Sequence, residues 1–409
     1  MDDSEPALPV RRGRELFVHL SGATVGRLAP PLLQLALLLI VSRGGSLDDV
    51  GLLALGSSVA FLCGALGELG FANSLSVPRV AFGSEAPPLG PTVRLRLAGA
   101  IAGSALFVVL WGAGIGHHHA ELLLLIPLPF ALALAHGYAG AMNASGLLHF
   151  EGKVSTVESV VALVLALVGT QIVDALPAAL FGLAAGRLVG TVGRGLLLRR
   201  VPQSSSVDVA SIPRSQLWFA LSTAGFVTQG QVDMVAIGLA GSLALAAVYG
   251  PAVRASGSIL LGGEAITYAL YGRAHPDEGE AVTWLRRRWR ALLLGAAVVA
   301  ALVFTLLAQP FLEWLLGRQL HGLGALIVLL AFVIVVRFAV LILGVDIVRA
   351  GRQREQVPML GAAGAVLAVG ASIAASADSL TGLAAARLAS EVVLVGGFAF
   401  LVRRAPSMR

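Results

Sequence analysis

Six arginines lie inside apolar segments that are long enough to cross a bilayer, and they are the residues of this sequence best suited to binding chemistry: Arg27, Arg187, Arg194, Arg254, Arg337 and Arg387. We call them the in-span arginines. An arginine at the bilayer centre costs about 2.5–3.5 kcal/mol on insertion scales. Six of them would exceed the usual net stability of a protein, so they cannot all face lipid. Each must pair with an acid, extend its side chain to the headgroups or line a hydrated cavity.

For three of these arginines, the neighbouring residues in the sequence suggest an expected role. Arg387 has Glu391 one helical turn further on, which predicts a structural ion pair within one helix. Arg187 has Thr191 at that place, so a cavity role and a pair with another helix both remain open. Arg194 lies five residues before Arg199, and we expect its side chain to reach the cytoplasmic headgroups.

The remaining three, Arg27, Arg254 and Arg337, lie near mid-depth without an acid one turn away, which favours a cavity. Together with Arg187, they are the candidate substrate-binding residues. The candidate counter-ions or coupling residues are Glu68, Asp233 and Glu264. A buried acid beside an arginine usually stays ionised, which favours structural pairs over proton carriers. The sequence therefore predicts a cationic cavity that suits an anionic cargo.

The elements that hold these residues are membrane-spanning helices. The chain has 409 residues, of which 57% are hydrophobic and 13% charged, about half the charged share of a soluble domain. Windows of about 20 apolar residues predict an all-α membrane protein of twelve spans, at approximately 16–41, 50–77, 93–115, 120–146, 153–173, 176–198, 216–240, 243–271, 290–309, 322–347, 357–376 and 379–402.

The distribution of positive charge predicts the orientation. With the N-terminus inside, 21 of the 29 Lys and Arg fall at inner ends and loops, 2 in outer turns and 6 within spans. The positive-inside rule then places both termini in the cytoplasm, in a multi-pass protein of the cell membrane. The predicted parts are a tail (1–15), a six-helix bundle (16–200), a linker (201–215), a second six-helix bundle (216–402) and a tail (403–409).

Two pairs of similar strings indicate that the second bundle repeats the first. "GLAAGRLV" (182–189) matches "GLAAARLA" (382–389), and "LGELGFANSL" (66–75) matches "LGGEAITYAL" (261–270). An even number of spans per half relates the halves by an axis along the membrane normal, as in transporters with a site between two halves. Gly182, Gly186 and Gly190 form a face of small residues that predicts close helix packing.

Several function classes are excluded or disfavoured. One cysteine excludes disulfides and cysteine metal sites within one chain, and "GHHHA" (116–120) is typical of a solvated turn. Basic residues at segment ends indicate membrane lipids, not nucleic acid, as partners. The sequence has no GxxxxGK loop for nucleotide hydrolysis. Because no predicted outer loop could hold a sugar site, an integral-membrane glycan polymerase or glycosyltransferase is disfavoured. We expect no enzyme, no cofactor and no metal.

Three stretches resemble polysaccharide flippases of the MATE-like, or MOP, exporter superfamily. They are "VGLLALGSSVAFLCGALGELGFANSLSVPRVAFG" (50–83), "QVDMVAIGLAGSLALAAVYGPAVRASG" (231–257), and "RAGRQR" (349–354) followed by two spans. The resemblance implies two six-helix bundles that form a V, with a central cavity lined by spans 1, 2, 7 and 8. Many members of that family have two spans more than this chain.

The resemblance also implies a function: transfer of an undecaprenyl-linked oligosaccharide from the inner to the outer leaflet by a monomer. The pyrophosphate of the cargo would contact Arg27 and Arg254 first, and Arg337 with less support. Glycan polymerases or glycosyltransferases of the same pathway are the expected protein partners. The alternative is a MATE-type drug or cation antiporter, which would favour exposed acids at mid-depth over arginines.

Overall fold

The computed structural model describes residues 28–76, 81, 87–115, 119–199, 212–271, 280–349 and 352–404, and these residues form helices and short connections without a strand. Each predicted span corresponds to a helix, with span 2 divided into α2 and α3 and span 4 into η1 and α6. The helices are Leu28–Gly44 (the first helix), α2 (Leu47–Gly67), α3 (Phe71–Ser76), α5 (Leu89–Gly112), η1 (Ala120–Leu125), α6 (Pro127–Ala144), α7 (Leu148–Gly169), α8 (Ala175–Leu198), α9 (Ile212–Ala240), α10 (Leu243–Tyr271), α11 (Glu280–Leu316), α12 (Gly324–Arg349), α13 (Gln353–Ser376) and α14 (Leu380–Arg404).

The length and composition of these helices suit a membrane. Ten helical segments are long and apolar enough to cross one, and the first helix is apolar but shorter within the described part of the chain. The twelfth, α9, has 29 residues and carries a row of polar side chains that are buried inside the protein: Gln216, Ser222, Thr223, Gln229 and Asp233. These side chains need polar partners because they lie away from water.

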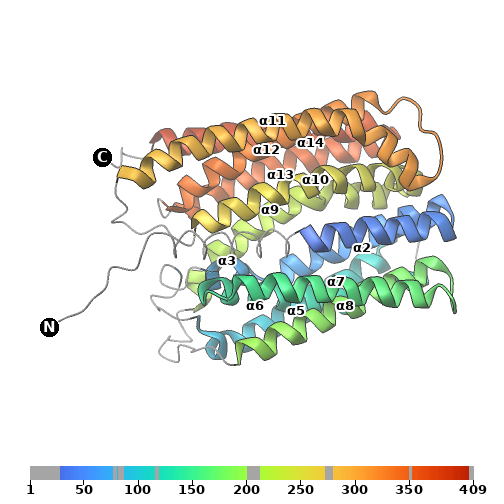
Figure 1. The fold of residues 1–409 in the computed structure, drawn as a ribbon, viewed down its shortest axis with the longest axis horizontal. Coiled ribbons are helices and arrows are strands. Elements are labelled where there is room, and N and C mark those ends of the chain that lie inside the picture. The colour runs from blue at the N-terminus through green and yellow to red at the C-terminus, as the bar shows by residue number, and fades with distance from the viewer. Residues whose placement is uncertain are drawn as a thin grey trace.

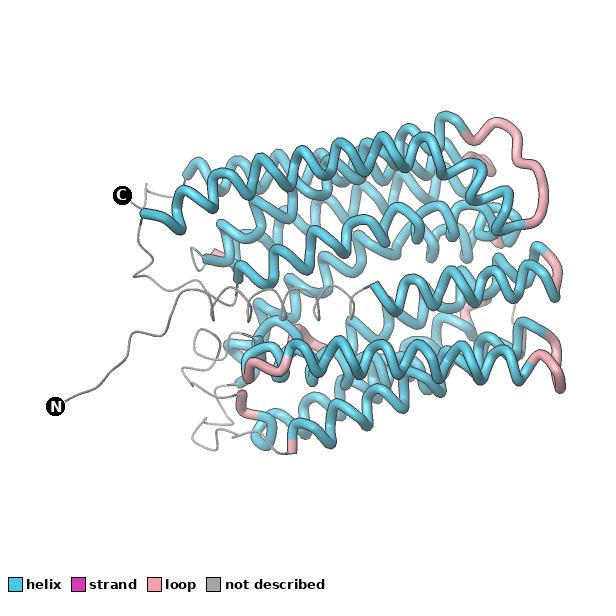
Figure 2. Tube along the Cα trace, in the orientation of Figure 1, coloured by secondary structure: helices cyan, strands magenta, loops and turns pink. Residues whose placement is uncertain are grey.

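The helices form two bundles, as predicted (Figure 1). The N-terminal bundle contains α2 and α5 to α8, and the C-terminal bundle contains α9 to α14. Basic residues gather at the end where α8 and α14 finish, which we call the basic end. Figure 2 shows several short loops at the opposite end, including those between α7 and α8 and between α11 and α12.

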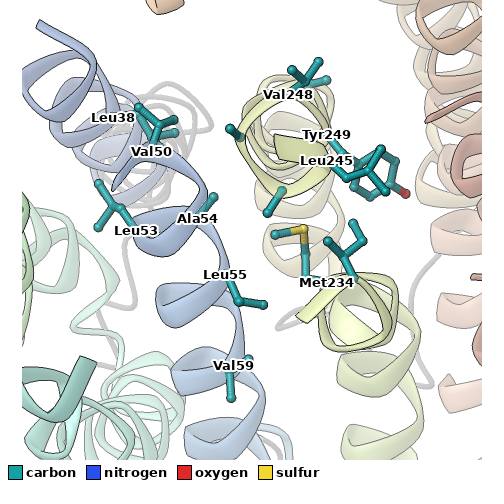
Figure 3. Packing of buried hydrophobic residues seen from close by; sticks show 14 of the residues in the cluster. Leu38, Val50, Leu53, Ala54, Leu55, Val59, Met234, Leu245, Val248 and Tyr249 are labelled. Carbon is teal, nitrogen blue, oxygen red and sulfur yellow. The ribbon is translucent and has the colours of Figure 1, made fainter. Parts of the chain in front are cut away.

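The bundles meet where α2 packs on α9 and α10 and where α3 packs on α9. Figure 3 shows Ala54 and Leu55 of α2 facing Met234 and Leu245 across this interface. In the same view Tyr249 of α10 points away from α2 into the C-terminal bundle. The helix α10 therefore contacts the other bundle with one face and its own bundle with another.

A break in span 2 distinguishes it from its repeat counterpart. The chain turns between α2 and α3 at Leu69 and Gly70, which have φ angles of 55° and 77°. A side chain at Gly70 would also collide with the backbone of Phe219 in α9, so glycine is required there for close approach. The helix α10 continues without a break through the matching string to Tyr271. The similar strings at 66–75 and 261–270 therefore have different backbones.

Candidate functional site

Two of the in-span arginines belong to an ion cluster between α7 and α8. Gly182, Gly186 and Gly190 of α8 lie directly against α7, as their spacing predicted. Arg187 donates to Glu158 at 2.8 Å, and Arg194 contacts Glu158 and Glu151, both at 2.7 Å. We call these four residues, Glu151, Glu158, Arg187 and Arg194, the N-terminal ion cluster. It contains two cations and two anions.

This cluster corrects the expectation for Arg194. Its side chain is 2% exposed and also donates to Ser155 at 2.8 Å, so it does not extend to the headgroups. Two carboxylates on the facing helix outweigh the gain from reaching water. Arg187 takes the interhelical pair that the sequence left open, in place of a cavity role. Glu151 and Glu158 are not among the predicted site residues, although the two acids and the two arginines are each seven residues apart in consecutive spans.

A second cluster joins three helices of the C-terminal bundle. Arg337 of α12 donates to Glu391 of α14 at 2.9 Å and to Gln229 of α9 at 3.0 Å. Arg387 of α14 forms an ion pair with Asp233 of α9. We call Asp233, Arg337, Arg387 and Glu391 the C-terminal ion cluster. It too contains two cations and two anions.

The arrangement differs from the predicted ion pair of Arg387 with Glu391 inside one helix. Arg387 binds Asp233 on α9, and Glu391 binds Arg337 on α12. The packed helices bring these opposite charges into direct contact, so neither residue pairs with the other one turn along α14. Asp233 is therefore the counter-ion of Arg387, and Tyr249 donates to the same carboxylate at 2.7 Å. Arg337, which we assigned to the substrate, is instead neutralised by Glu391.

Arg254 has a different environment. It lies on the face of α10 that meets α2, and it donates to the carbonyl of Ala54 at 2.7 Å and to the hydroxyls of Ser57 and Ser58. Among the described residues, no carboxylate forms an ion pair with it. A side chain added at Gly257, one turn along α10, would meet empty space. Arg254 is thus a partly exposed cation at the interface between the bundles, held by neutral groups.

The remaining predicted site residues are only partly described. Arg27 lies outside the described residues, as does the side chain of Glu264. Glu68 is buried at the end of α2 and accepts a hydrogen bond from the backbone N–H of Ala72 in α3, so it caps the break in span 2. Within the described ranges, no group of acids, histidines or cysteines could hold a metal ion.

The charges of the site follow from these pairs. Both ion clusters are neutral, so they hold their helices together without leaving a net charge in the membrane. In the part of the chain that the structure describes, Arg254 is then the in-span arginine without an acid partner. A single fixed cation between two bundles can bind an anionic group by charge-assisted hydrogen bonds.

Comparison with known proteins gives the fold. No protein-family model matches the sequence, and no curated protein matches it. Among solved structures, the eukaryotic MATE transporter AtDTX14 is similar with a TM-score of 0.69, at 15% identity over 97% of this chain and 96% of the other. This chain has the MATE fold.

Two further structures with this fold are similar over nearly all of both chains. A MOP superfamily transporter from Pyrococcus furiosus, described as having a binding pocket of reverse polarity, has a TM-score of 0.64 at 13% identity, with 95% of each chain covered. A variant of the Vibrio cholerae MATE transporter VcmN has a TM-score of 0.63 at 16% identity, with 95% of this chain and 97% of the other covered. The MATE fold confirms the predicted pair of six-helix bundles.

Proposed function

We propose that this protein is a membrane exporter that transfers a lipid-linked oligosaccharide, carried on polyprenyl pyrophosphate, from the inner to the outer leaflet. The observation that carries this proposal is the position of Arg254. It is a partly exposed cation at the interface between the bundles, without an acid partner among the described residues. The pyrophosphate of the cargo would contact Arg254, and Arg27 remains a proposed second contact.

The fold supports alternating access as the mechanism. Each bundle has its own buried ion cluster, whereas the contact between the bundles depends mainly on α2 with α9 and α10. Two internally fixed bodies that meet along a few helices can rotate against each other. Solved MATE transporters with this fold include inward-facing and outward-facing conformations, at TM-scores of 0.58 and 0.63. By the same proposal the protein lies in the cell membrane with both termini cytoplasmic.

The first experiment measures the cargo in cells. In a strain without this gene, polyprenyl-linked oligosaccharide should accumulate while surface glycan falls, and a wild-type copy should reverse both changes. An Arg254→Ala copy should fail to reverse them. Arg318→Ala, at an exposed arginine in the turn after α11, is the matched control and should behave as the wild type.

A second experiment measures binding directly. Purified protein in detergent is titrated with undecaprenyl pyrophosphate and with undecaprenol, which has the same chain without the charge. We expect the pyrophosphate to bind at least about tenfold more tightly, because a hydrogen bond to a charged group contributes about 1.5–3 kcal/mol. Arg254→Gln should abolish this preference, and equal binding of both lipids by the wild type would contradict the proposal.

The alternative is a MATE-type drug or cation antiporter, and the buried carboxylate of Asp233 is the observation that favours it. This carboxylate is fully occupied by Arg387 and Tyr249, which leaves it little capacity for a cationic cargo. The same deletion strain separates the two functions. Unchanged glycan lipid with increased sensitivity to toxic organic cations would support the antiporter.

A further inference from the structure

A cavity lies at the opposite end of the molecule from the basic end, between the first helix and the turn from α7 to α8. Its volume is about 470 Å³, and its lining divides into an apolar part and a polar rim. The apolar part includes Leu39, Ile40 and Leu167, and the rim includes Arg43, Thr170 and Asp174. The cavity is open on one side, so it suits the end of an elongated ligand that extends beyond it.

Arg43 and Asp174 line this cavity together but form no ion pair with each other. The only described partner of the Arg43 guanidinium is the carbonyl of Trp314 at 2.8 Å, so most of its donors remain available. Asp174 precedes α8 in the position of an N-cap, yet its side chain makes no capping hydrogen bond. Both side chains are exposed. The cavity therefore offers a separate cation and a separate anion to one ligand.

The surroundings indicate that this ligand is a lipid. Ile172 and Val173 in the turn beside the cavity are 80% and 50% exposed, and Leu167 on α7 is 49% exposed. Apolar side chains this exposed at the end of a membrane-spanning helix face acyl chains. The charged rim lies at the level where spans end, which is the level of the headgroups.

We propose that this cavity binds the headgroup of a zwitterionic aminophospholipid. The phosphate would accept hydrogen bonds from Arg43, and the primary ammonium would donate to Asp174. The proximal acyl chain would lie along Leu39, Ile40 and Leu167. Phosphatidylethanolamine fits this arrangement because it carries a phosphate and a hydrogen-bonding ammonium in one headgroup. An anionic headgroup without an amine would leave Asp174 unpaired, and a choline headgroup has no N–H to donate.

The position of the site connects it to both bundles. Directly beside the cavity, Ser42 donates to the carbonyl of Leu315 at 2.6 Å, and Arg43 reaches Trp314, so the end of the first helix contacts the end of α11. Gly44 lies against Ala175 at the start of α8. A lipid bound to Arg43 and Asp174 would stabilise the first helix against α8. This inference does not depend on the cargo proposed above.

The test uses the full chain, purified in detergent, with phosphatidylethanolamine, phosphatidylglycerol and phosphatidylcholine of identical acyl chains. Binding is counted by native mass spectrometry, and the midpoint of thermal unfolding is followed in parallel. We expect phosphatidylethanolamine to bind most tightly and to raise the midpoint most. Equal binding and equal shifts for the three lipids would overturn the proposal.

Four variants assign the headgroup contacts. Asp174→Asn should lower the affinity for phosphatidylethanolamine by about tenfold or more, to that of phosphatidylglycerol, whereas Arg43→Gln should weaken both. Asp48→Asn and Arg318→Gln change exposed charges of the same end outside the cavity lining, and they should leave the preference intact. If Asp174→Asn still preferred phosphatidylethanolamine to phosphatidylglycerol, the assignment of the ammonium to Asp174 would be wrong. Because Asp174 is exposed, we expect this variant to fold as the wild type does.

Discussion

The two ion clusters start from the same local sequence and end in different architectures. Arg187 and Arg387 occupy the same position in "GLAAGRLV" and "GLAAARLA". Arg187 pairs with Glu158 on α7, the preceding helix, and the whole N-terminal ion cluster lies within the hairpin of α7 and α8. Arg387 pairs with Asp233 on α9, and the C-terminal ion cluster joins α9, α12 and α14.

The difference shows that a repeated motif fixes the position of a charge but not its partner. In the N-terminal bundle the acids are on the adjacent hairpin helix, so the cluster stabilises a local unit. In the C-terminal bundle the partner is on α9, which also packs against α2 of the other bundle. The C-terminal ion cluster therefore connects the last helix to the interface between the bundles, and the N-terminal ion cluster does not.

The largest expected effect comes from Arg194. Arg194→Leu leaves the half-buried carboxylate of Glu151 without a cation and the buried carboxylate of Glu158 with Arg187 alone. We expect the free energy of unfolding to fall by about 3–5 kcal/mol. Arg290→Leu is the control, because Arg290 is 45% exposed and its pair with Asp346 should contribute at most about 1 kcal/mol. The measurement is equilibrium unfolding in detergent. Similar losses for the two variants would show that the hairpin does not depend on its ion cluster.

The next effect tests the long-range pair of Asp233 with Arg387. Asp233→Asn should destabilise by about 3 kcal/mol, because Arg387 keeps the carbonyl of Gly230 but loses its counter-charge. The double variant Asp233→Asn, Arg387→Gln should be more stable than the sum of the single changes by about 0.5–3 kcal/mol. A parallel cycle of Asp233→Asn with Arg187→Gln should be additive within about 0.5 kcal/mol. Coupling in that second cycle would contradict the separation of the two clusters.

A smaller effect concerns Gly186 and Ala386, one of the two positions at which the repeated strings differ. Gly186→Ala places a methyl group against Ala162 and the carbonyl of Glu158, and overpacking of this kind costs about 1–3 kcal/mol. The reverse change at the matching position, Ala386→Gly, should cost about 1 kcal/mol, which is the difference in helix propensity. Thermal unfolding compares the two. If Gly186→Ala were stabilising, α7 and α8 would not be held as closely as the structure shows.

The smallest effect is expected at the interface. Ser57→Ala removes one acceptor of Arg254, whose guanidinium still donates to the carbonyl of Ala54, so the loss should be about 0.5–1.5 kcal/mol. The same unfolding measurement applies. A loss as large as that of Arg194→Leu would mean that Arg254 fixes the two bundles together, in contradiction to a residue that is available to cargo.

The sequence predicted the helices well because they depend on local hydrophobicity. Twelve apolar windows and the spacing of Gly182, Gly186 and Gly190 required no knowledge of distant residues. The break at Leu69 was not predictable from "LGELGFANSL", since the close approach of Phe219 that accompanies it involves a residue 150 positions away.

The ion pairs were less predictable, because each depends on which helix lies opposite. Arg387 has a suitable acid one turn away and does not use it, and Arg194 has a short route to the headgroups and does not take it. Ion pairs between consecutive helices can be recognised in the sequence by equal spacings. Glu151 and Glu158 of α7 have the same seven-residue spacing as Arg187 and Arg194 of α8. Arg254 was identified correctly as lacking a local acid, but its contacts with α2 required the structure.

The long separation of Asp233 and Arg387 has a consequence for biosynthesis. The two residues are 154 positions apart, whereas Arg194 follows Glu151 by 43. At about 5–20 residues per second, a ribosome needs roughly 8–30 s to extend the chain from Asp233 to Arg387. During that time the carboxylate of α9 is inside or beside the membrane without its arginine. The C-terminal bundle therefore becomes electrically complete only when the final helix emerges, and a nascent chain that stops before α14 would be a substrate for membrane quality control.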